Sequence, residues 1–121
     1  MLSEEVMWKG IERLCNEEVV INSLSGSSHH KITAFISASK SYTITYGPSG
    51  KSIDADFSKV YKMYSMLCGN GRLFNKDMEN GGHDEIGMSS WNRPGSAMLA
   101  VIPHLDSEVQ VYSDGEVGLM L

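Results

Sequence analysis

The feature that most constrains this chain is a stripe of apolar side chains between residues 57 and 68. Side chains three and four positions apart share one face of an α-helix. The stripe consists of Phe57, Val60, Tyr61, Tyr64, Leu67 and Cys68. Asp54 or Asp56 can cap this helix, and Gly69-Asn70-Gly71 stops it, because Gly and Asn readily adopt the left-handed C-cap conformation. We therefore predict an amphipathic helix that lies across a β-sheet.

Three short segments before this helix have the composition of β-strands. They are residues 19–24, 31–37 and 41–46, and they are rich in β-branched or aromatic residues. The residues that would share one strand face are Ile32, Ala34 and Ile36 in the second segment and Tyr42, Ile44 and Tyr46 in the third. Because the connections between the segments are short, we predict an antiparallel meander.

The stretch YGPSGKSID, residues 46–54, has the ending of a phosphate-binding loop. The full pattern, G-x-x-x-x-G-K-[ST], needs its first glycine at position 45, which is Thr45. Gly47-Pro48-Ser49-Gly50 instead has the chemistry of a β-turn, since proline presets φ and glycine permits positive φ. We predict a hairpin or strand-exit turn rather than a nucleotide-binding loop.

Two further segments complete the predicted elements at the ends of the chain. Ser3 caps an N-terminal helix whose apolar face consists of Met7, Trp8, Ile11, Leu14 and Cys15. Asp114-Gly115 lies between residues 108–113 and 116–121, and this dipeptide between alternating segments is a strong hairpin signal. The sequence therefore predicts a helix at the start and a β-hairpin at the end.

Residues 94–103 fit two structures, a buried helix and a buried strand. We favour the helix, with Asn92 or Arg93 as its cap, Pro94 in its first turn and Pro103 at its end. Strands that are grouped, rather than alternating with helices, indicate an α+β fold. The predicted architecture is an antiparallel sheet, formed by the N-terminal three-strand meander and the C-terminal hairpin, packed by two or three helices in a single domain, 1–121.

Composition and charge exclude several classes of protein. Fifteen acidic residues outnumber ten scattered basic residues, and the formal net charge is −5. A nucleic-acid partner is not expected, because such proteins present a basic patch. We expect no signal peptide, because the first ten residues contain no basic region followed by an apolar run, and no membrane association, because no apolar run is long enough to span a membrane. Cys15 and Cys68 are predicted to be reduced thiols, and we expect a cytoplasmic location.

The candidate chemical motifs are incomplete. His83-Asp84-Glu85 matches the H-x-E fragment of zinc deaminases, but the sequence has no C-x-x-C pair to complete that site. His29-His30 supplies adjacent ligands that point apart on an extended chain, and His104 with Asp106 supplies only two ligands. We therefore predict no catalytic residue, metal or cofactor, while convergence of carboxylates from distant segments stays an open alternative.

Residues 75–95 contain mainly Asn, Gly, Asp and Ser and show no periodic pattern. A long irregular loop in a small domain is often functional. Trp91 is expected to anchor its end in the core. The residues proposed for ligand or partner contact are Tyr61, Tyr64, His83, Asp84, Glu85 and Trp91.

Two functional hypotheses follow from these features. The first is a non-enzymatic binding or accessory protein that forms a homo-oligomer, a dimer in the simplest case, or contacts another protein through an apolar edge. Its basis is the apolar end of the chain, Gly118-Leu119-Met120-Leu121. The alternative is a small enzyme or small-ligand binder with a pocket under the 75–95 loop. We prefer the first hypothesis at this level, because each catalytic fragment lacks its other half.

Overall fold

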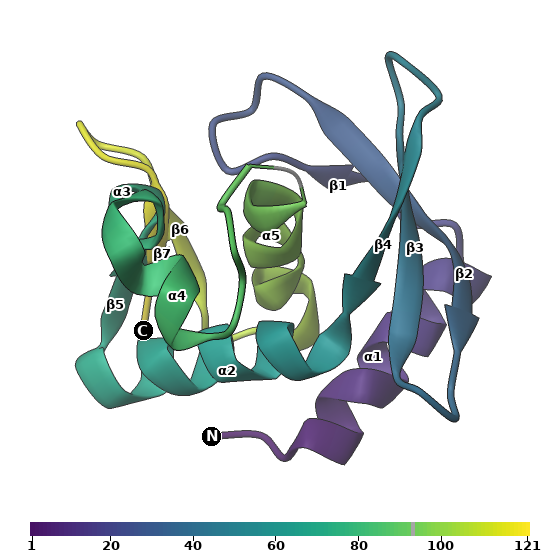
Figure 1. The fold of residues 1–121 in the computed structure, drawn as a ribbon, viewed down its shortest axis with the longest axis horizontal. Helices are drawn as coiled ribbons and strands as arrows, with labels where there is room; N and C mark the ends of the chain where they lie inside the picture. Colours follow the sequence, from purple (N-terminus) through teal and green to yellow (C-terminus); the bar gives the residue numbers. More distant parts are fainter. Residues whose placement is uncertain (93) are drawn as a thin grey trace.

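The computed structural model describes residues 1–92 and 94–121 (Figure 1). The fold is α+β with antiparallel strands, as the sequence predicts, although the meander and the C-terminal hairpin belong to two separate sheets. The elements in chain order are α1 (Glu4–Asn16), β1 (Ile21–Asn22), β2 (His29–Ile36), β3 (Ser41–Tyr46), β4 (Ser52–Asp56), α2 (Phe57–Asn70), β5 (Arg72–Phe74), α3 (Asn75–Asp77), the π-helical turn η1 (Met78–Gly82), α4 (His83–Glu85), α5 (Gly95–Leu105), β6 (Gln110–Tyr112) and β7 (Gly118–Met120).

The first sheet is the predicted meander with one additional strand. Its order is β1-β2-β3-β4, and every neighbouring pair is antiparallel. The turn at residues 47–50 joins β3 to β4, so the hairpin reading of this stretch is confirmed. The sequence reading missed β4, because it assigned Asp54 and Asp56 to a helix cap. Asp56 does cap α2, since its carboxylate accepts the Ser58 N–H at 2.9 Å, but it is also the last residue of β4.

A β-bulge in β2 changes which residues face the core. The register shifts between Ile32 and Ala34, so these two residues and Ile36 do not share one face as predicted. Ile32 is buried, Phe35 turns toward the core, and Ile36 is 61% exposed. An extra residue in one strand reverses the side-chain alternation beyond it. The predicted alternation on β3 is confirmed, because Tyr42 and Ile44 are buried.

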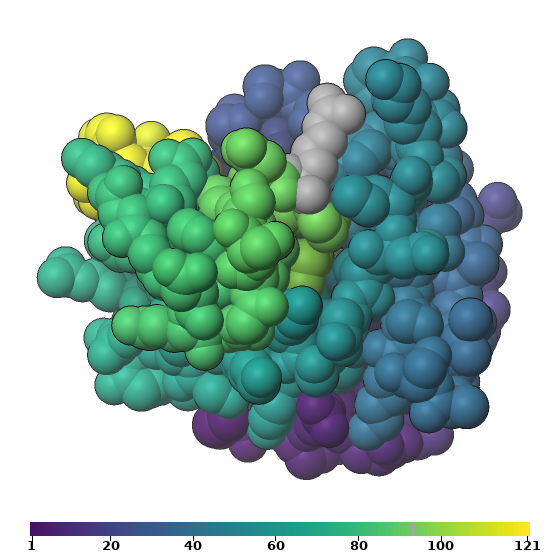
Figure 2. All heavy atoms as spheres, viewed as in Figure 1, coloured from purple at the N-terminus to yellow at the C-terminus, as the bar shows by residue number. Residues whose placement is uncertain are grey.

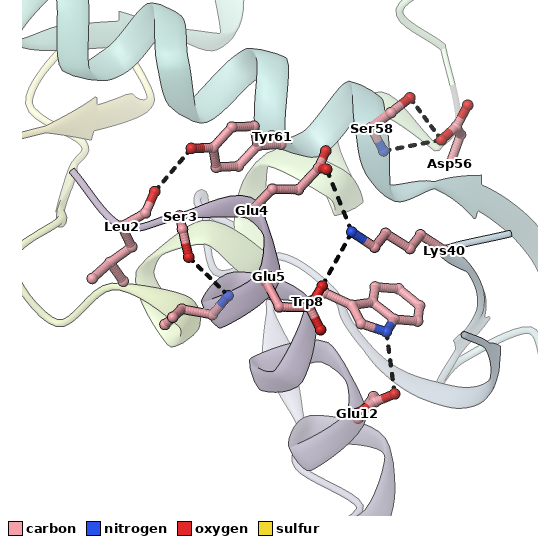
Figure 3. A network of polar contacts seen from close by, with 11 residues as sticks. Leu2, Ser3, Glu4, Glu5, Trp8, Glu12, Lys40, Asp56, Ser58 and Tyr61 are labelled. Atoms are coloured by element: carbon pink, nitrogen blue, oxygen red, sulfur yellow. Dashed lines mark hydrogen bonds and ion pairs between the residues drawn. The ribbon is translucent and has the colours of Figure 1, made fainter. Parts of the chain in front are cut away.

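Helices α1 and α2 are the predicted amphipathic helices. The Ser3 hydroxyl accepts the Val6 N–H as the N-cap of α1, and Lys40 reaches Glu4 and Glu5 on the same helix (Figure 3). In α2 the buried residues are Phe57, Val60, Met63, Tyr64 and Leu67. Gly71 ends α2 in the left-handed conformation, at φ 79°. The fully buried stripe includes Met63, which was not in the predicted stripe. Tyr61 and Cys68 were predicted to belong to it, but both are only partly buried.

Helix α5 lies between the two sheets (Figure 1). Residues 97–102 are all buried, which explains why the sequence shows no polar face there. The helical reading is thus confirmed, but Pro103 does not end the helix, which continues to Leu105. Proline removes one N–H donor near the last turn, and the buried apolar residues on all sides keep the helix intact.

The second sheet contains the predicted C-terminal hairpin and a strand that the sequence reading missed. Its order is β5-β7-β6. The C-terminal strand β7 is therefore the central strand and not an exposed edge, and Leu119 on it is fully buried. This corrects the expectation of an apolar edge at the end of the chain. The reason is β5, whose three residues are too few for a visible pattern.

Residues 75–95 are more regular than predicted. α3, η1 and α4 follow one another from Asn75 to Glu85, although Asn80 and Gly81 depart from helical geometry. These turns are too short to produce a helical pattern in the sequence. Trp91 is 5% exposed, which confirms its expected role as an anchor. The suggested cap at Arg93 lies outside the described residues. Within the described residues, no helix is long and apolar enough to cross a membrane.

Candidate ligand-binding cleft

A cleft of about 330 Å³ separates the first sheet from the segment that leads into α5. Its sheet side is lined by Ser28, His30, Tyr46, Pro48 and Ser49, together with Ser23. Its opposite side is lined by Glu79, Trp91, Asn92, Pro94, Ser96 and Ala97. Figure 2 shows the face of the molecule on which the green segment before α5 and the teal β3–β4 hairpin lie near each other. The cleft therefore lies between the meander and the end of the 75–95 segment.

His30 occupies the sheet wall of the cleft. It pairs with Ile21 on β1 and with Tyr46 on β3, so strands flank it on both sides. Because side chains alternate along a strand, His30 shares the inward face with Ile32, whereas His29 faces outward. The His30 and Tyr46 rings are 6.0 Å apart between centroids and are tilted by 54°. His30 is only 3% exposed, so its imidazole is a buried polar group in the wall of an open site.

The His30 imidazole is uncharged at neutral pH. Burial, together with the smaller effects of His104 and His29, lowers the pKa of His30 from 6.5 to about 4. Burial disfavours the charged form of a histidine because the surroundings solvate it less well than water. No hydrogen bond joins the His30 side chain to another residue in the described part of the chain. Among the described residues, only the Tyr42 hydroxyl is a fully enclosed side-chain atom without a partner, so the His30 ring nitrogens face the space of the cleft.

Asn75 organises the opposite wall. Its side-chain oxygen accepts hydrogen bonds from Trp91 Nε1 at 2.7 Å and from Ser96 Oγ at 3.1 Å. Its side-chain nitrogen donates to Glu79 Oε1 at 3.1 Å. The Asn75 backbone N–H is bonded to the Val117 carbonyl at 2.8 Å, which ties it to the second sheet. One residue thus fixes three cleft-lining side chains from three separate segments.

Gly95 allows the Trp91 ring to pack against the start of α5. A Cβ atom at position 95 would lie 2.6 Å from Trp91 Cδ2, which is closer than carbon atoms approach without displacement. Any larger residue would therefore push the indole away from the helix. The position of Trp91, and with it the shape of the cleft, depends on glycine at this site.

The residues predicted for ligand contact lie in three places. Trp91 lines the cleft. Tyr64 is fully buried, where its hydroxyl donates to Asp106 Oδ2 at 2.7 Å, and Tyr61 donates to the Leu2 carbonyl at 2.9 Å (Figure 3). His83 Nδ1 lies 2.7 Å from the Met78 carbonyl, inside its own helical segment. The structure therefore brings Trp91 together with His30, and not with the tyrosines or with His83.

Asp84 and Glu85 are exposed, and neither lines the cleft. His83 Nε2 and Asp84 Oδ1 are 3.8 Å apart. In the described part of the chain, no group of three or more His, Cys, Asp and Glu side chains is arranged to hold a metal ion. The H-x-E fragment is thus a helical turn with two solvent-facing carboxylates.

Sequence reasoning missed His30 and Ser49 as cleft residues, and it missed Asn75 as the residue that holds Trp91 and Ser96. The predicted second strand begins at residue 31, after both histidines, whereas β2 begins at His29. The missed signal was alternation, since His30 precedes Ile32 by two positions and belongs to the same strand face. Asn75 and Ser49 carry no local signal, because their positions result from contacts between distant segments.

Comparisons of the chain with protein-family models, with curated proteins and with solved structures found no match, so the cleft is interpreted from its own geometry.

Proposed function

We propose that this protein binds a small molecule in the cleft between the first sheet and the wall that contains Trp91, Asn92, Pro94, Ser96 and Ala97. The observation that carries the proposal is the cleft itself, with the buried and unpartnered His30 imidazole in its wall. Its volume of about 330 Å³ lies within the range of small-molecule sites. Ligand sites combine aromatic walls with a few fixed polar groups, and here Trp91 and Tyr46 lie beside serine, asparagine and histidine side chains.

Preorganisation supports binding over an accidental surface hollow. Asn75 holds Trp91, Ser96 and Glu79 in place before any ligand arrives. A wall that is already ordered loses less conformational entropy when a ligand binds. In the opposite wall, His30 and Tyr46 belong to β2 and β3 and are held in place by the pairing of these two strands.

The proposal is for binding and not for catalysis. A catalytic histidine is held by an orienting partner and lies beside a nucleophile or substrate proton. His30 has no such hydrogen-bonded partner among the described residues. The neutral imidazole therefore serves best as a hydrogen-bonding group for a ligand.

A melting-temperature screen tests the proposal. The compounds are neutral sugars, amines, carboxylates and phosphates, and hits are mapped by amide chemical shifts. We expect at least one class to stabilise the protein and to shift cleft resonances. Ser49→Trp would fill the cleft mouth from an exposed position, whereas Ser39→Trp, exposed on the β2–β3 turn, is the matched control. Stabilisation that survives Ser49→Trp, or no hit in any class, would contradict the proposal.

Self-association is a second candidate function. β6 is an edge strand of the second sheet, and its Val111 is 51% exposed. An exposed edge strand can pair with a second copy of the chain to form a homodimer. Val111→Lys should then convert the dimer to a monomer in light scattering at micromolar concentration. A wild-type protein that is monomeric under these conditions removes this candidate.

Two further expectations belong to the same proposal. The partner is a small molecule and not a nucleic acid, in keeping with the acidic net charge of −5. A cytoplasmic location is supported by Cys15 and Cys68, which are not joined to each other.

A further inference from the structure

We propose that the ligand is anionic, and that its carboxylate or phosphate oxygens bind between the N-terminus of α5 and the His30 side chain. This inference rests on the proposed function, because it assigns a chemical class to the ligand of the same cleft.

The first observation is an uncapped helix N-terminus in the cleft. α5 has eleven residues, and no side chain caps its start. The first of its N–H groups with an acceptor belongs to Met98, which is bonded to the Pro94 carbonyl at 2.9 Å. Among the described residues, nothing accepts the N–H groups of Gly95, Ser96 and Ala97. Such N–H groups, with the positive end of the helix dipole, favour an anion.

Two of these three residues are buried, and Ser96 between them is exposed. Gly95 is buried, and Ala97 is 7% exposed. A buried helix end without partners costs free energy unless a ligand or ordered water supplies the acceptors. Pro94, Ser96 and Ala97 all line the cleft, so an acceptor placed there reaches the start of the helix.

The second observation is independent and comes from the opposite wall. His30 is 3% exposed, lines the same cleft and donates to no described acceptor. Each tautomer of a neutral imidazole carries one N–H, which can donate to an oxyanion. Ser49 adds a hydroxyl, since its oxygen accepts the Lys51 N–H at 3.2 Å and its proton remains available to donate. Donors from both walls thus face one cleft.

Glu79 places a negative charge in the same cleft, and its replacement provides a test of the anionic ligand. It is the one carboxylate among the described cleft residues, and Asn75 holds it at 3.1 Å. Its negative charge repels an anion in the same cleft. If the ligand is an anion, Glu79→Gln should tighten binding, whereas a cationic ligand should bind more weakly to this variant.

The experiment is a titration of the ¹⁵N-labelled protein with sodium phosphate, sodium sulfate and sodium citrate at constant ionic strength. Sodium chloride is the control for general salt effects. We expect saturable shifts of the Gly95 and Ser96 amides and of the His30 ring resonances with at least one oxyanion. Phosphate tests whether the cleft binds phosphate oxygens, and citrate tests whether it binds carboxylate oxygens. If chloride produces the same shifts, or if no oxyanion moves these resonances, the inference is wrong.

A pair of variants tests the His30 contact. His30→Phe should weaken oxyanion binding about tenfold, which is the usual effect of losing one hydrogen bond to a charged group. His29→Phe, on the outer face of the same strand, should leave binding unchanged. If His30→Phe does not fold, His30→Asn is the substitute, and it should retain part of the affinity because its amide donates. Equal affinities for the wild type and the folded His30 variant would overturn the inference.

The two proposals fail in different ways. If only neutral compounds from the melting screen bind in the cleft, the site is real and the anionic assignment is wrong. If no compound of any class binds there, both proposals are wrong.

Discussion

The hydroxyl of Tyr64 donates a 2.7 Å hydrogen bond to the carboxylate of Asp106, which lies 42 positions later in the chain. The same hydroxyl accepts the Leu2 N–H at 2.8 Å. Asp106 also accepts the Glu108 N–H at 3.0 Å through its other oxygen. This buried contact joins the start of the chain, the centre of α2 and the end of α5. Burial raises the pKa of Tyr64, so the hydroxyl remains a donor.

We expect Tyr64→Phe to destabilise the protein by about 2 kcal/mol, because it leaves Asp106 and the Leu2 N–H without this partner. Tyr42→Phe is the matched control. The Tyr42 hydroxyl is buried and has no hydrogen-bond partner in the described part of the structure. Its removal should be neutral or stabilising by up to about 1 kcal/mol. Urea unfolding measures both values, and equal losses of stability would contradict this account of the core.

The buried His30 should make folding stability depend on pH. Its pKa is 6.5 in the unfolded chain and about 4 in the folded protein, so the unfolded state binds the proton more readily. The neutral His30 side chain makes its full contribution to the free energy of unfolding above about pH 6.5, and this contribution is lost as the pH falls toward about pH 4. The shift corresponds to about 3 kcal/mol.

Urea unfolding at several pH values, compared between wild type and His30→Phe, measures this effect. The pKa of His104 is also lowered, by burial and then by Arg13, so His104 contributes with the same sign in both proteins. The free energy of unfolding of the wild type should decrease relative to that of His30→Phe as the pH falls. If the difference in unfolding free energy between the wild type and His30→Phe does not change with pH, His30 has the same pKa in the folded and the unfolded state.

Asn75→Ala should disrupt the wall that carries Trp91. The variant leaves Trp91 Nε1 without its acceptor, so we expect a loss of about 1–2 kcal/mol of stability. The Trp91 indole N–H resonance should move strongly, because its hydrogen bond is lost. Asn80→Ala, an exposed position in η1, is the control and should leave that resonance in place.

Two glycine substitutions should have opposite effects. Gly95→Ala places a methyl group against the Trp91 ring, and we expect it to destabilise the protein by about 1–3 kcal/mol. Gly69→Ala lies in α2 with no atom within 4 Å of the added methyl group. It should stabilise the helix by about 0.5–1 kcal/mol, since alanine loses less backbone entropy. Thermal unfolding separates the two, and a stabilising Gly95→Ala would contradict the packing described for Trp91.

The elements predicted correctly are those whose signals are local. The helix from Phe57 to Asn70 and the turns at residues 47–50 and at Asp114-Gly115 each depend on spacing or on turn residues within a few positions. β5 was not predictable in this way, because three residues carry no period and gain their strand geometry from β7. The bulge in β2 likewise has no local signature, so the outward position of Ile36 was missed.

The cleft depends on contacts that the sequence does not display. Trp91 was recognised from its size and position, but Asn75 matters because it meets Trp91 and Ser96 in space. His30 was considered as a metal ligand, and its role in a cleft wall became apparent only from the register of β2 against β3.

A crystal structure with the most stabilising compound from the melting screen tests the central claim most directly. The account predicts electron density in the cleft, within contact distance of Trp91 and with an oxygen atom hydrogen-bonded to His30. Density for the compound at any other surface, with the cleft holding only water, would contradict it.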